Sequence, residues 1–473
     1  MAEGKPAKIA KGERALFSGK MGFVLAAAAS AVGLGNMWRF PYLAAKYGGG
    51  TFLIVYIILV VTFGFALMIA ETALGRLTRK SVIGAYSHFG KKFAFIGVLA
   101  ALVPIIITPY YCVIGGWVTR YMVGYLTMPA AELAADGFFG SFVTSTSGDT
   151  FMWLGVFIAI VVLVVALGVK NGIERVNKVL MPLLIVMAIG IFIYAMTLDG
   201  ALDGLKYYLI PDVSKLSINL VVAAMGQMFF SLSLAMGIMV TYGSYFKKDD
   251  DLEKSVRRIE IFDTGIAILA GLMIIPAAVA VTGSPDAVAG HAGPGLMFGV
   301  LPQVFTDLGG AGRIVGFVFF ALVFFAALTS AISLFETCVS IFCDGAKISR
   351  AKSIALCTGL ILVLAIICNL GYNAWIGLDP MYSLFGIGEY QSMQILDFMD
   401  FISNTILMPI VALLTCIFVG WIIKPKKIAD EVRESSKFRS EKLFNVMIKF
   451  IAPIFTILIL IFYVLNTTGA IVL

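Results

Sequence analysis

Residues 30–41 read Ser-Ala-Val-Gly-Leu-Gly-Asn-Met-Trp-Arg-Phe-Pro and interrupt a stretch that is otherwise apolar. Unwound backbone is tolerated inside a membrane only where it lines a protein or water cavity, because its N–H and C=O groups need partners. The stretch therefore predicts a discontinuous transmembrane helix. In transporters, such interruptions point to the site that binds substrate and ions.

The composition of the chain is that of an integral membrane protein. Of its 473 residues, 60% are hydrophobic and only 13% are charged, and the mean hydropathy is +0.97. Those values exclude a soluble globular domain. No loop between the apolar segments is long enough to fold separately, so we predict a single integral membrane domain over residues 1–473.

Apolar runs of about 20 residues, the length that spans a bilayer as a helix, recur along the whole chain. They predict an all-α polytopic membrane protein with about 11 transmembrane helices. The expected spans are 21–43, 51–74, 93–126, 151–169, 177–197, 217–245, 260–283, 313–342, 353–370, 392–423 and 445–469.

The charges of the loops predict the orientation of the chain. Lys and Arg are concentrated in one set of loops, and basic loops stay in the cytoplasm. This places the amino terminus in the cytoplasm, and it explains the net charge of +7 without nucleic acid as a partner. The basic loops are 75–92, 170–178, 246–258, 344–352 and 424–444, whereas 127–150, 284–306 and 371–391 contain neither residue type.

A second interruption lies about 200 residues after the first, where the sixth span carries Ser-Leu-Ser-Leu-Ala-Met-Gly at 231–237. Five spans separate the two beginnings, and an odd number inverts the second unit in the membrane. Paired interruptions of this kind are typical of inverted-repeat transporters. We therefore predict a 5+5 inverted-repeat core with discontinuous helices 1 and 6. The first repeat covers about 20–197, the second about 215–424, and an additional helix about 445–469.

These residues resemble the neurotransmitter:sodium symporter family, in its bacterial branch of multi-hydrophobic amino acid transporters. The resemblance covers spans one to ten. It implies a sodium-coupled secondary symporter of the bacterial inner (plasma) membrane that works by alternating access, and not an enzyme. The family's twelfth span is missing, so the oligomeric state stays open. The matching motifs are Gly33–Pro41, Gly48–Gly50, Glu71 with Gly75-Arg76, Tyr110-Tyr111 and Ala326–Ser330.

The resemblance also implies two sodium ions and no organic cofactor. An interrupted helix supplies carbonyl oxygens that an intact helix has already used. Hydrogen bonding of Thr329 and Ser330 back to their own helix is the alternative to a sodium role. One ion would bind the carbonyls of Ala29, Val32 and Ala326 and the hydroxyls of Thr329 and Ser330. The other would bind the Ala31 carbonyl and the side chains of Asn36, Ser231 and Asp263.

Asp263 departs from the family pattern, in which a neutral asparagine is common at this position. A carboxylate at the membrane centre costs roughly 2.5–3.5 kcal/mol and calls for a cation or a proton. We predict that it replaces the anion that chloride-dependent relatives need, so that transport is independent of chloride. Proton counter-movement is a further hypothesis, and the alternative role for the carboxylate is to cap a neighbouring helix.

The substrate is also implied by the resemblance. Amine-transporting relatives carry an aspartate at the position of Gly33, so glycine indicates a substrate that brings its own carboxylate. Neutral hydrophobic and aromatic L-amino acids fit, and the adaptable side chain of Met236 predicts a broad pocket. For Ile107, plain packing against a neighbouring span is an equal alternative. The predicted substrate residues are Ala31, Gly33, Leu34, Gly35, Ile107, Tyr111, Phe230, Ser231, Ser233, Met236, Ser330 and Leu334.

Charged residues on both sides of this pocket predict two gates. By resemblance, Arg39 pairs with Asp400, or with Asp397 in another register, and closes the outer path. On the inner side the corresponding set is Arg14, Asp344 and Tyr245.

The start of the fifth span carries Gly172 and Pro182, which lower helix stability. They predict either a stretch that unwinds to open a water path or a merely kinked helix start. A transport-inactive amino acid sensor on the same fold is the main alternative function.

Overall fold

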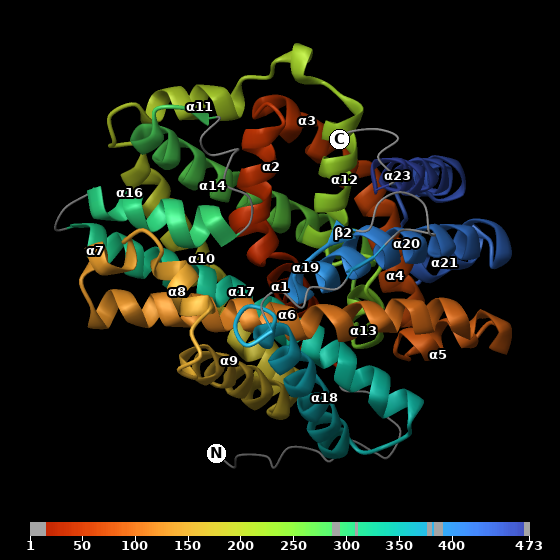
Figure 1. The fold of residues 1–473 in the computed structure, drawn as a ribbon. Helices are drawn as coiled ribbons and strands as arrows, with labels where there is room; N and C mark the ends of the chain where they lie inside the picture. The colour runs from red at the N-terminus through yellow and green to blue at the C-terminus, as the bar shows by residue number, and fades with distance from the viewer. Residues whose placement is uncertain (1–15, 286–293, 308–310, 376–380, 383–390, 468–473) are drawn as a thin grey trace, which may run out of the picture.

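The computed structural model describes residues 16–285, 294–307, 311–375, 381–382 and 391–467, and these residues are almost entirely helical (Figure 1). Within them, nine helical runs are long and apolar enough to cross a membrane, and a bent pair forms a tenth span. The predicted fold class, an all-α polytopic membrane protein, is confirmed. The nine runs are Gly50–Thr78, Lys91–Thr127, Asp149–Ala166, Val169–Ala195, Leu252–Thr282, Gly312–Gly345, Arg350–Leu370, Ile395–Ile422 and Glu441–Phe462.

The individual elements follow one another with short connections. The first part of the chain forms α1 (Lys20–Ala31), η1 (Gly35–Arg39), α2 (Phe40–Lys46), α3 (Gly50–Leu59), η2 (Val60–Gly64), α4 (Phe65–Thr78), α5 (Val82–Ser87), η3 (Lys91–Phe93), α6 (Ala94–Thr127), α7 (Ala130–Leu133), α8 (Phe138–Val143), α9 (Asp149–Ala166), η4 (Val169–Glu174), α10 (Arg175–Ala195), α11 (Ala201–Leu209) and η5 (Val213–Lys215).

The second part forms α12 (Ile218–Ser231), α13 (Ile238–Ser244), α14 (Leu252–Thr282), η6 (Gly295–Val300), α16 (Leu301–Asp307), α17 (Gly312–Gly345), α18 (Arg350–Leu370), β1 (Met381–Tyr382), β2 (Gln391–Ser392), α19 (Ile395–Asp400), η9 (Phe401–Leu407), α20 (Met408–Ile417), η10 (Phe418–Ile422), α21 (Pro425–Arg433), α22 (Glu441–Val446), η11 (Met447–Ile451) and α23 (Ala452–Thr467). The two short strands pair in an antiparallel manner.

The expected sixth span, 217–245, is two helices rather than one. α12 ends at Ser231 and α13 begins at Ile238, so the interruption predicted from the sequence separates two short rods. Other spans are longer than their apolar runs. α14 begins at Leu252, before the expected 260, because the Asp251 side chain accepts a hydrogen bond from the Lys254 N–H at 3.0 Å and caps the helix.

The interrupted first helix lies at the centre of the molecule (Figure 1). α1 contacts α10, α14 and α17, and α17 also packs along α6. The run Ala26–Ala29 is fully buried. Small side chains let helix backbones approach closely, which is how membrane helices pack without a hydrophobic driving force. Helices from both halves of the chain therefore pack closely around the interrupted first helix.

Long-range hydrogen bonds mark the two ends of the bundle. At one end, Lys247 donates to the Ser18 carbonyl at 2.8 Å, and Arg350 donates to the Val165 carbonyl at 2.9 Å. We call this side the basic end, and the sequence predicts that it faces the cytoplasm. At the opposite end, the Thr51 hydroxyl donates to the Asp212 carbonyl at 2.8 Å. The orientation itself stays a prediction.

Candidate functional site

The first helix breaks where the sequence predicts it. α1 ends at Ala31, and Val32 has an extended backbone. The Gly33 N–H donates to the Asn36 side-chain oxygen at 3.1 Å. A side chain thus accepts the hydrogen bond that a backbone carbonyl would accept in an intact helix. The helices before and after the break, Lys20–Ala31 and Gly35–Lys46, are bent by 53°. The discontinuous first helix is confirmed.

The sixth helix breaks between Ser231 and Ile238. Ser233 and Ala235 have φ values of 54° and 59°, in the left-handed region that costs energy for residues other than glycine. The Ala235 N–H donates to a carboxylate oxygen of Glu71 at 2.8 Å. Glu71 is 2% exposed, so a buried acid from α4 holds this strained backbone in place.

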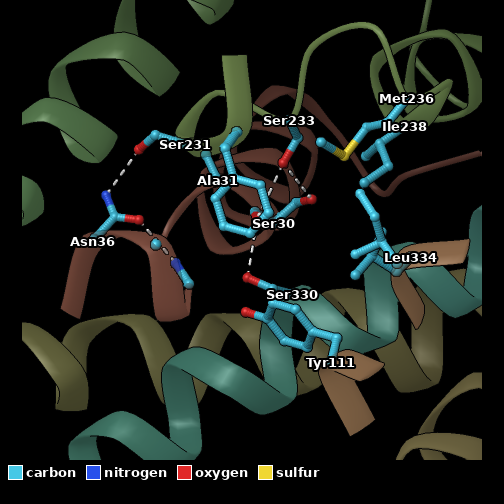
Figure 2. Close-up of a pocket in the computed structure, with 14 residues that line it drawn as sticks. Ser30, Ala31, Asn36, Tyr111, Ser231, Ser233, Met236, Ile238, Ser330 and Leu334 are labelled. Carbon is cyan, nitrogen blue, oxygen red and sulfur yellow. Dashed lines mark hydrogen bonds between the residues drawn. The ribbon is translucent and has the colours of Figure 1, made fainter. Parts of the chain in front are cut away.

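The two breaks face each other across a narrow cavity with about 330 Å³ of empty space (Figure 2). The Ser233 hydroxyl donates to the Ser30 carbonyl at 3.3 Å and so joins one break to the other. Figure 2 shows that apolar side chains gather at one end of the cavity and that Asn36 and Ser231 lie at the other. The lining residues are Ser30, Ala31, Gly33, Gly35, Asn36, Ile107, Tyr111, Phe230, Ser231, Ser233, Met236, Ile238, Ser330 and Leu334.

All the predicted substrate residues except Leu34 line this cavity. The Leu34 N–H donates to the Tyr111 hydroxyl oxygen at 3.0 Å, and its side chain lines a second cavity above the first. Ser30 and Ile238 also line the first cavity but were not predicted. Both residues directly flank a break. Their positions beside Ala31 and Gly237 in the sequence could have predicted that they line the cavity.

Two glycines leave the room that this cavity needs. A Cβ atom at Gly33 would lie 2.4 Å from the Ser330 hydroxyl oxygen and 2.7 Å from that of Tyr111. At Gly35, a Cβ atom would lie 2.6 Å from the ring of Phe230. Cβ atoms do not approach other atoms this closely, so no side chain fits at Gly33 or Gly35 unless its neighbours move. An acid at position 33 would therefore displace the residues that surround the cavity.

Next to the cavity, Asn36, Ser231 and Asp263 form a buried polar cluster. The Asn36 amide donates to Asp263 Oδ1 at 2.8 Å, and the Ser231 hydroxyl donates to the same oxygen at 2.8 Å. Tyr56 donates to Asp263 Oδ2 at 3.3 Å. Asp263 is fully buried, and no described basic side chain forms an ion pair with it. Tyr56 could not be predicted as a member of this cluster, because it stands within an apolar run.

The second predicted sodium set lies where α17 meets the end of α1. The Ser330 hydroxyl donates to the carbonyls of Ser30 at 2.9 Å and Val32 at 3.3 Å. The Thr329 hydroxyl instead donates back to its own helix, to Phe325 at 3.0 Å and Ala326 at 3.1 Å, as the alternative interpretation anticipated. A hydroxyl that donates keeps its lone pairs, so this bonding is compatible with binding a cation. Ala29 is fully buried at the same end of α1.

Arg39 and Asp400, the two residues predicted to form the outer gate, line a vestibule with about 830 Å³ of empty space next to the cavity. Asp400 accepts a hydrogen bond from Tyr110 at 2.9 Å, and the Arg39 guanidinium lies 5.6 Å from the centre of the Phe230 ring. No salt bridge joins Arg39 to Asp400 in the described structure, and Asp397 lines the same vestibule. Phe230 and Tyr111 line both cavities, so the two cavities adjoin at these side chains.

At the basic end, the predicted gate residues lie in different networks. Asp344 accepts from the Ser81 N–H at 2.6 Å, and Arg14 lies outside the described residues. Tyr245 donates to Glu336 at 2.7 Å. Arg350 forms a salt bridge of 2.6 Å with the same carboxylate, which is fully buried.

The Glu336–Arg350 pair was not predicted from the sequence. An acid inside an apolar span is energetically costly and needs a partner. The position of Glu336 within such a span could therefore have predicted that it pairs with a basic residue. Above the pair, Phe17 is buried and makes edge-to-face contacts with Tyr242 and Tyr245. Phe17, Tyr242, Tyr245 and Glu336 therefore form one buried group at the basic end.

The region around Gly172 is a π-helical turn, Val169–Glu174, followed by α10 with Pro182 inside it. Glu174 accepts from the Ser18 N–H at 2.9 Å and pairs with Lys178 at 2.6 Å. The stretch is thus irregular but still helical, and it holds the chain that leads into α1. Whether it opens a water path stays a prediction.

Two discontinuous helices that meet at a central cavity define the core of a secondary transporter. The sequence pattern of the Sodium:neurotransmitter symporter family matches residues 14–134 and 143–471. The chain belongs to this family, whose members are transporters and not enzymes.

Individual relatives are similar over nearly their full length. The chain is 32% identical over 468 residues to a sodium-dependent transporter of Haemophilus influenzae, covering 95% of this chain and 98% of that protein. It is 34% identical over 471 residues to the sodium-dependent transporter YhdH of Bacillus subtilis, covering 97% and 98%. The crystal structure of MhsT in complex with L-phenylalanine matches with a TM-score of 0.83 and 36% identity, over 96% of this chain and 100% of that chain.

Proposed function

We propose that this protein takes up neutral hydrophobic and aromatic L-amino acids by sodium symport, through alternating access and without chloride. The observation that carries the proposal is the chemistry of the cavity between the two helix breaks. Ile107, Met236 and Leu334 give it an apolar wall, and no charged side chain of the described residues lines it. A zwitterion with an apolar side chain suits both this wall and the freed backbone groups. The similar structure of MhsT holds L-phenylalanine.

The two charged groups of an amino acid would bind at the breaks. Tyr111 accepts a hydrogen bond from Leu34 through its oxygen, so its O–H can donate to the substrate carboxylate. The N–H groups near Gly35, at the start of the second half of helix 1, favour the same negative charge. The amino group would meet the carbonyls of Ala31 and Phe230, near the Ser233 hydroxyl.

Two sodium ions would travel with the substrate. The Asp263 cluster supports one ion, because a buried carboxylate without a basic partner attracts a cation. The Ser330 hydroxyl and the carbonyls it contacts support the other, between α17 and the end of α1. Asp263 supplies a negative charge of its own, which supports transport without chloride.

Uptake by proteoliposomes tests the proposal. Purified protein is reconstituted, and uptake of radiolabelled L-phenylalanine, L-leucine, L-glutamate and L-lysine is measured with sodium or potassium outside. We expect saturable, sodium-dependent uptake of the first two amino acids and none of the charged pair. Sodium-dependent binding without uptake would instead identify an amino acid sensor on this fold.

Replacing external chloride with gluconate tests the role of Asp263 in the same vesicles. We expect uptake to be unchanged within the error of the assay. Loss of uptake in gluconate would contradict the assignment, because an external anion would then be needed beside the sodium ion.

A further inference from the structure

A strongly basic pocket lies apart from the substrate cavity, at the basic end, where η10, α21, α22 and η11 contact one another. Figure 1 shows α21 beside α20, away from α1 at the centre. It has about 1020 Å³ of empty space, open to solvent. Four cationic side chains line it: Lys424, Lys426, Arg433 and Lys449. The transport proposal makes no use of this pocket.

The charge of the pocket is largely unbalanced. Glu441 is the one acid that lines it, and both of its carboxylate oxygens are taken by Arg433. Within the described part of the chain, no carboxylate lies within 4 Å of Lys424, Lys426 or Lys449. Three lysines that line one hollow and have no carboxylate partner among the described residues favour an anionic ligand.

The pocket lies at the depth of lipid headgroups. The apolar span Ile395–Ile422 ends directly before Lys424. Trp421 is 57% exposed, its indole N–H donates to the Lys449 carbonyl at 3.1 Å, and the Lys449 ammonium lies 5.7 Å from the ring centre. Trp and Lys mark the boundary between acyl chains and water. Beside them, Ile422 and Phe450 are 44% and 50% exposed and continue as an apolar surface.

We propose that this pocket binds the headgroup of an anionic phospholipid of the adjoining leaflet. The three lysines would bind the phosphate, and the exposed apolar surface that includes Ile422 and Phe450 would lie against the acyl chains. Basic pockets between membrane helices recognise such headgroups. A free phosphate ion could bind the lysines but would leave the adjoining apolar surface uncovered. A phospholipid would contact both, so the observations favour a lipid.

Native mass spectrometry tests the proposal with the full chain in a non-ionic detergent. The protein is titrated with phosphatidylglycerol or phosphatidylcholine of the same acyl chains, and bound lipid is counted. We expect roughly tenfold tighter binding of phosphatidylglycerol, from several lysines at the membrane surface. The triple variant Lys424→Gln, Lys426→Gln, Lys449→Gln should lose most of that preference.

The matched control is the triple variant Lys170→Gln, Lys347→Gln, Lys352→Gln, which removes the same charge from exposed positions outside the pocket. It should keep the preference. A pocket variant that still prefers phosphatidylglycerol would overturn the proposal, and so would equal loss in both variants. The single variant Lys426→Glu, at an exposed side chain, should lower the preference at least threefold if the triple variant does not fold. Displacement of the lipid by millimolar inorganic phosphate would show a free-anion site instead.

Discussion

At the scale of single residues, the position of each hydroxyl and glycine around the cavity decides what can bind. Asn36, Ser231 and Asp263 come from three separate helices and share hydrogen bonds of about 3 Å. Their residue types and their resemblance to a family motif allowed this cluster to be predicted. Tyr56 joins it through side-chain geometry alone, which no local sequence pattern records.

Gly33→Ala should weaken amino acid binding. The added Cβ would lie 2.4 Å from the Ser330 oxygen and would push apart the residues that form the cavity. Overpacking of this size costs about 1–3 kcal/mol, so affinity for L-phenylalanine should fall roughly fivefold to a hundredfold. Gly155→Ala is the matched control, because nothing lies within 4 Å of a Cβ there. Equal affinities of the two variants would contradict this account of the cavity.

Asp263→Asn should weaken sodium binding selectively. The carboxylate is fully buried and accepts from Asn36, Ser231 and Tyr56, so its charge is concentrated where an ion would bind. Interactions with a charged group contribute about 1.5–3 kcal/mol, which predicts a rise of roughly tenfold or more in the sodium concentration for half-maximal L-phenylalanine binding. Asp203→Asn, at an exposed acid paired with Lys206, is the control. An unchanged sodium dependence in the Asp263 variant would remove this residue from the ion site.

At the scale of elements, the interruptions of helices 1 and 6 were predictable because glycine and polar residues stand inside apolar runs. The lengths of the helices beyond the membrane were less predictable. α14 extends back to Leu252 through a cap at Asp251 that apolar periodicity does not reveal. The π-helical turn at Val169–Glu174 was likewise not predicted. Glycine and proline indicate that a helix is less stable, but they do not indicate which irregular conformation the backbone adopts.

One buried ion pair joins α4 to α21 at the basic end. Arg76 of α4 and Glu431 of α21 form a salt bridge of 2.7 Å, with side chains that are 0% and 1% exposed. Removing one partner leaves an uncompensated buried charge, which costs about 3–5 kcal/mol. Glu431→Gln should therefore lower the melting temperature strongly in detergent. The control is Glu434→Gln, whose pair with Lys248 is about half exposed and should contribute at most about 1 kcal/mol. Equal effects would show that the buried pair does not fasten α21.

At the scale of the whole molecule, Phe17, Tyr245 and Glu336 lie buried at the basic end, whereas Arg39 and Asp400 line a vestibule next to the cavity. The repeat boundaries were predicted from the paired interruptions and the number of spans between them, whereas the gate residues were predicted from family resemblance. The sequence could not predict that Arg39 and Asp400 form no salt bridge in the described structure, because a gate built from them would have an open and a closed position with the same residues.

Coupling of two sodium ions to one zwitterion predicts electrogenic uptake. Two charges moving through about 100 mV contribute roughly 4.6 kcal/mol. A tenfold sodium gradient adds about 1.4 kcal/mol for each ion, so the sum supports on the order of 10⁵-fold accumulation. An inside-negative potassium diffusion potential should therefore accelerate L-phenylalanine uptake in proteoliposomes. Uptake that does not respond to the potential would contradict net movement of positive charge.

The central claim is that the freed backbone groups of helices 1 and 6 together hold an amino acid beside a cation. A high-resolution cryo-EM or crystal structure with sodium and L-phenylalanine tests it most directly. We predict the ligand between Gly33 and Ser233, with its ring toward Met236 and a cation bound by Asn36 and Asp263. Density for L-phenylalanine outside this cavity, or an empty cavity at saturating ligand, would contradict the claim.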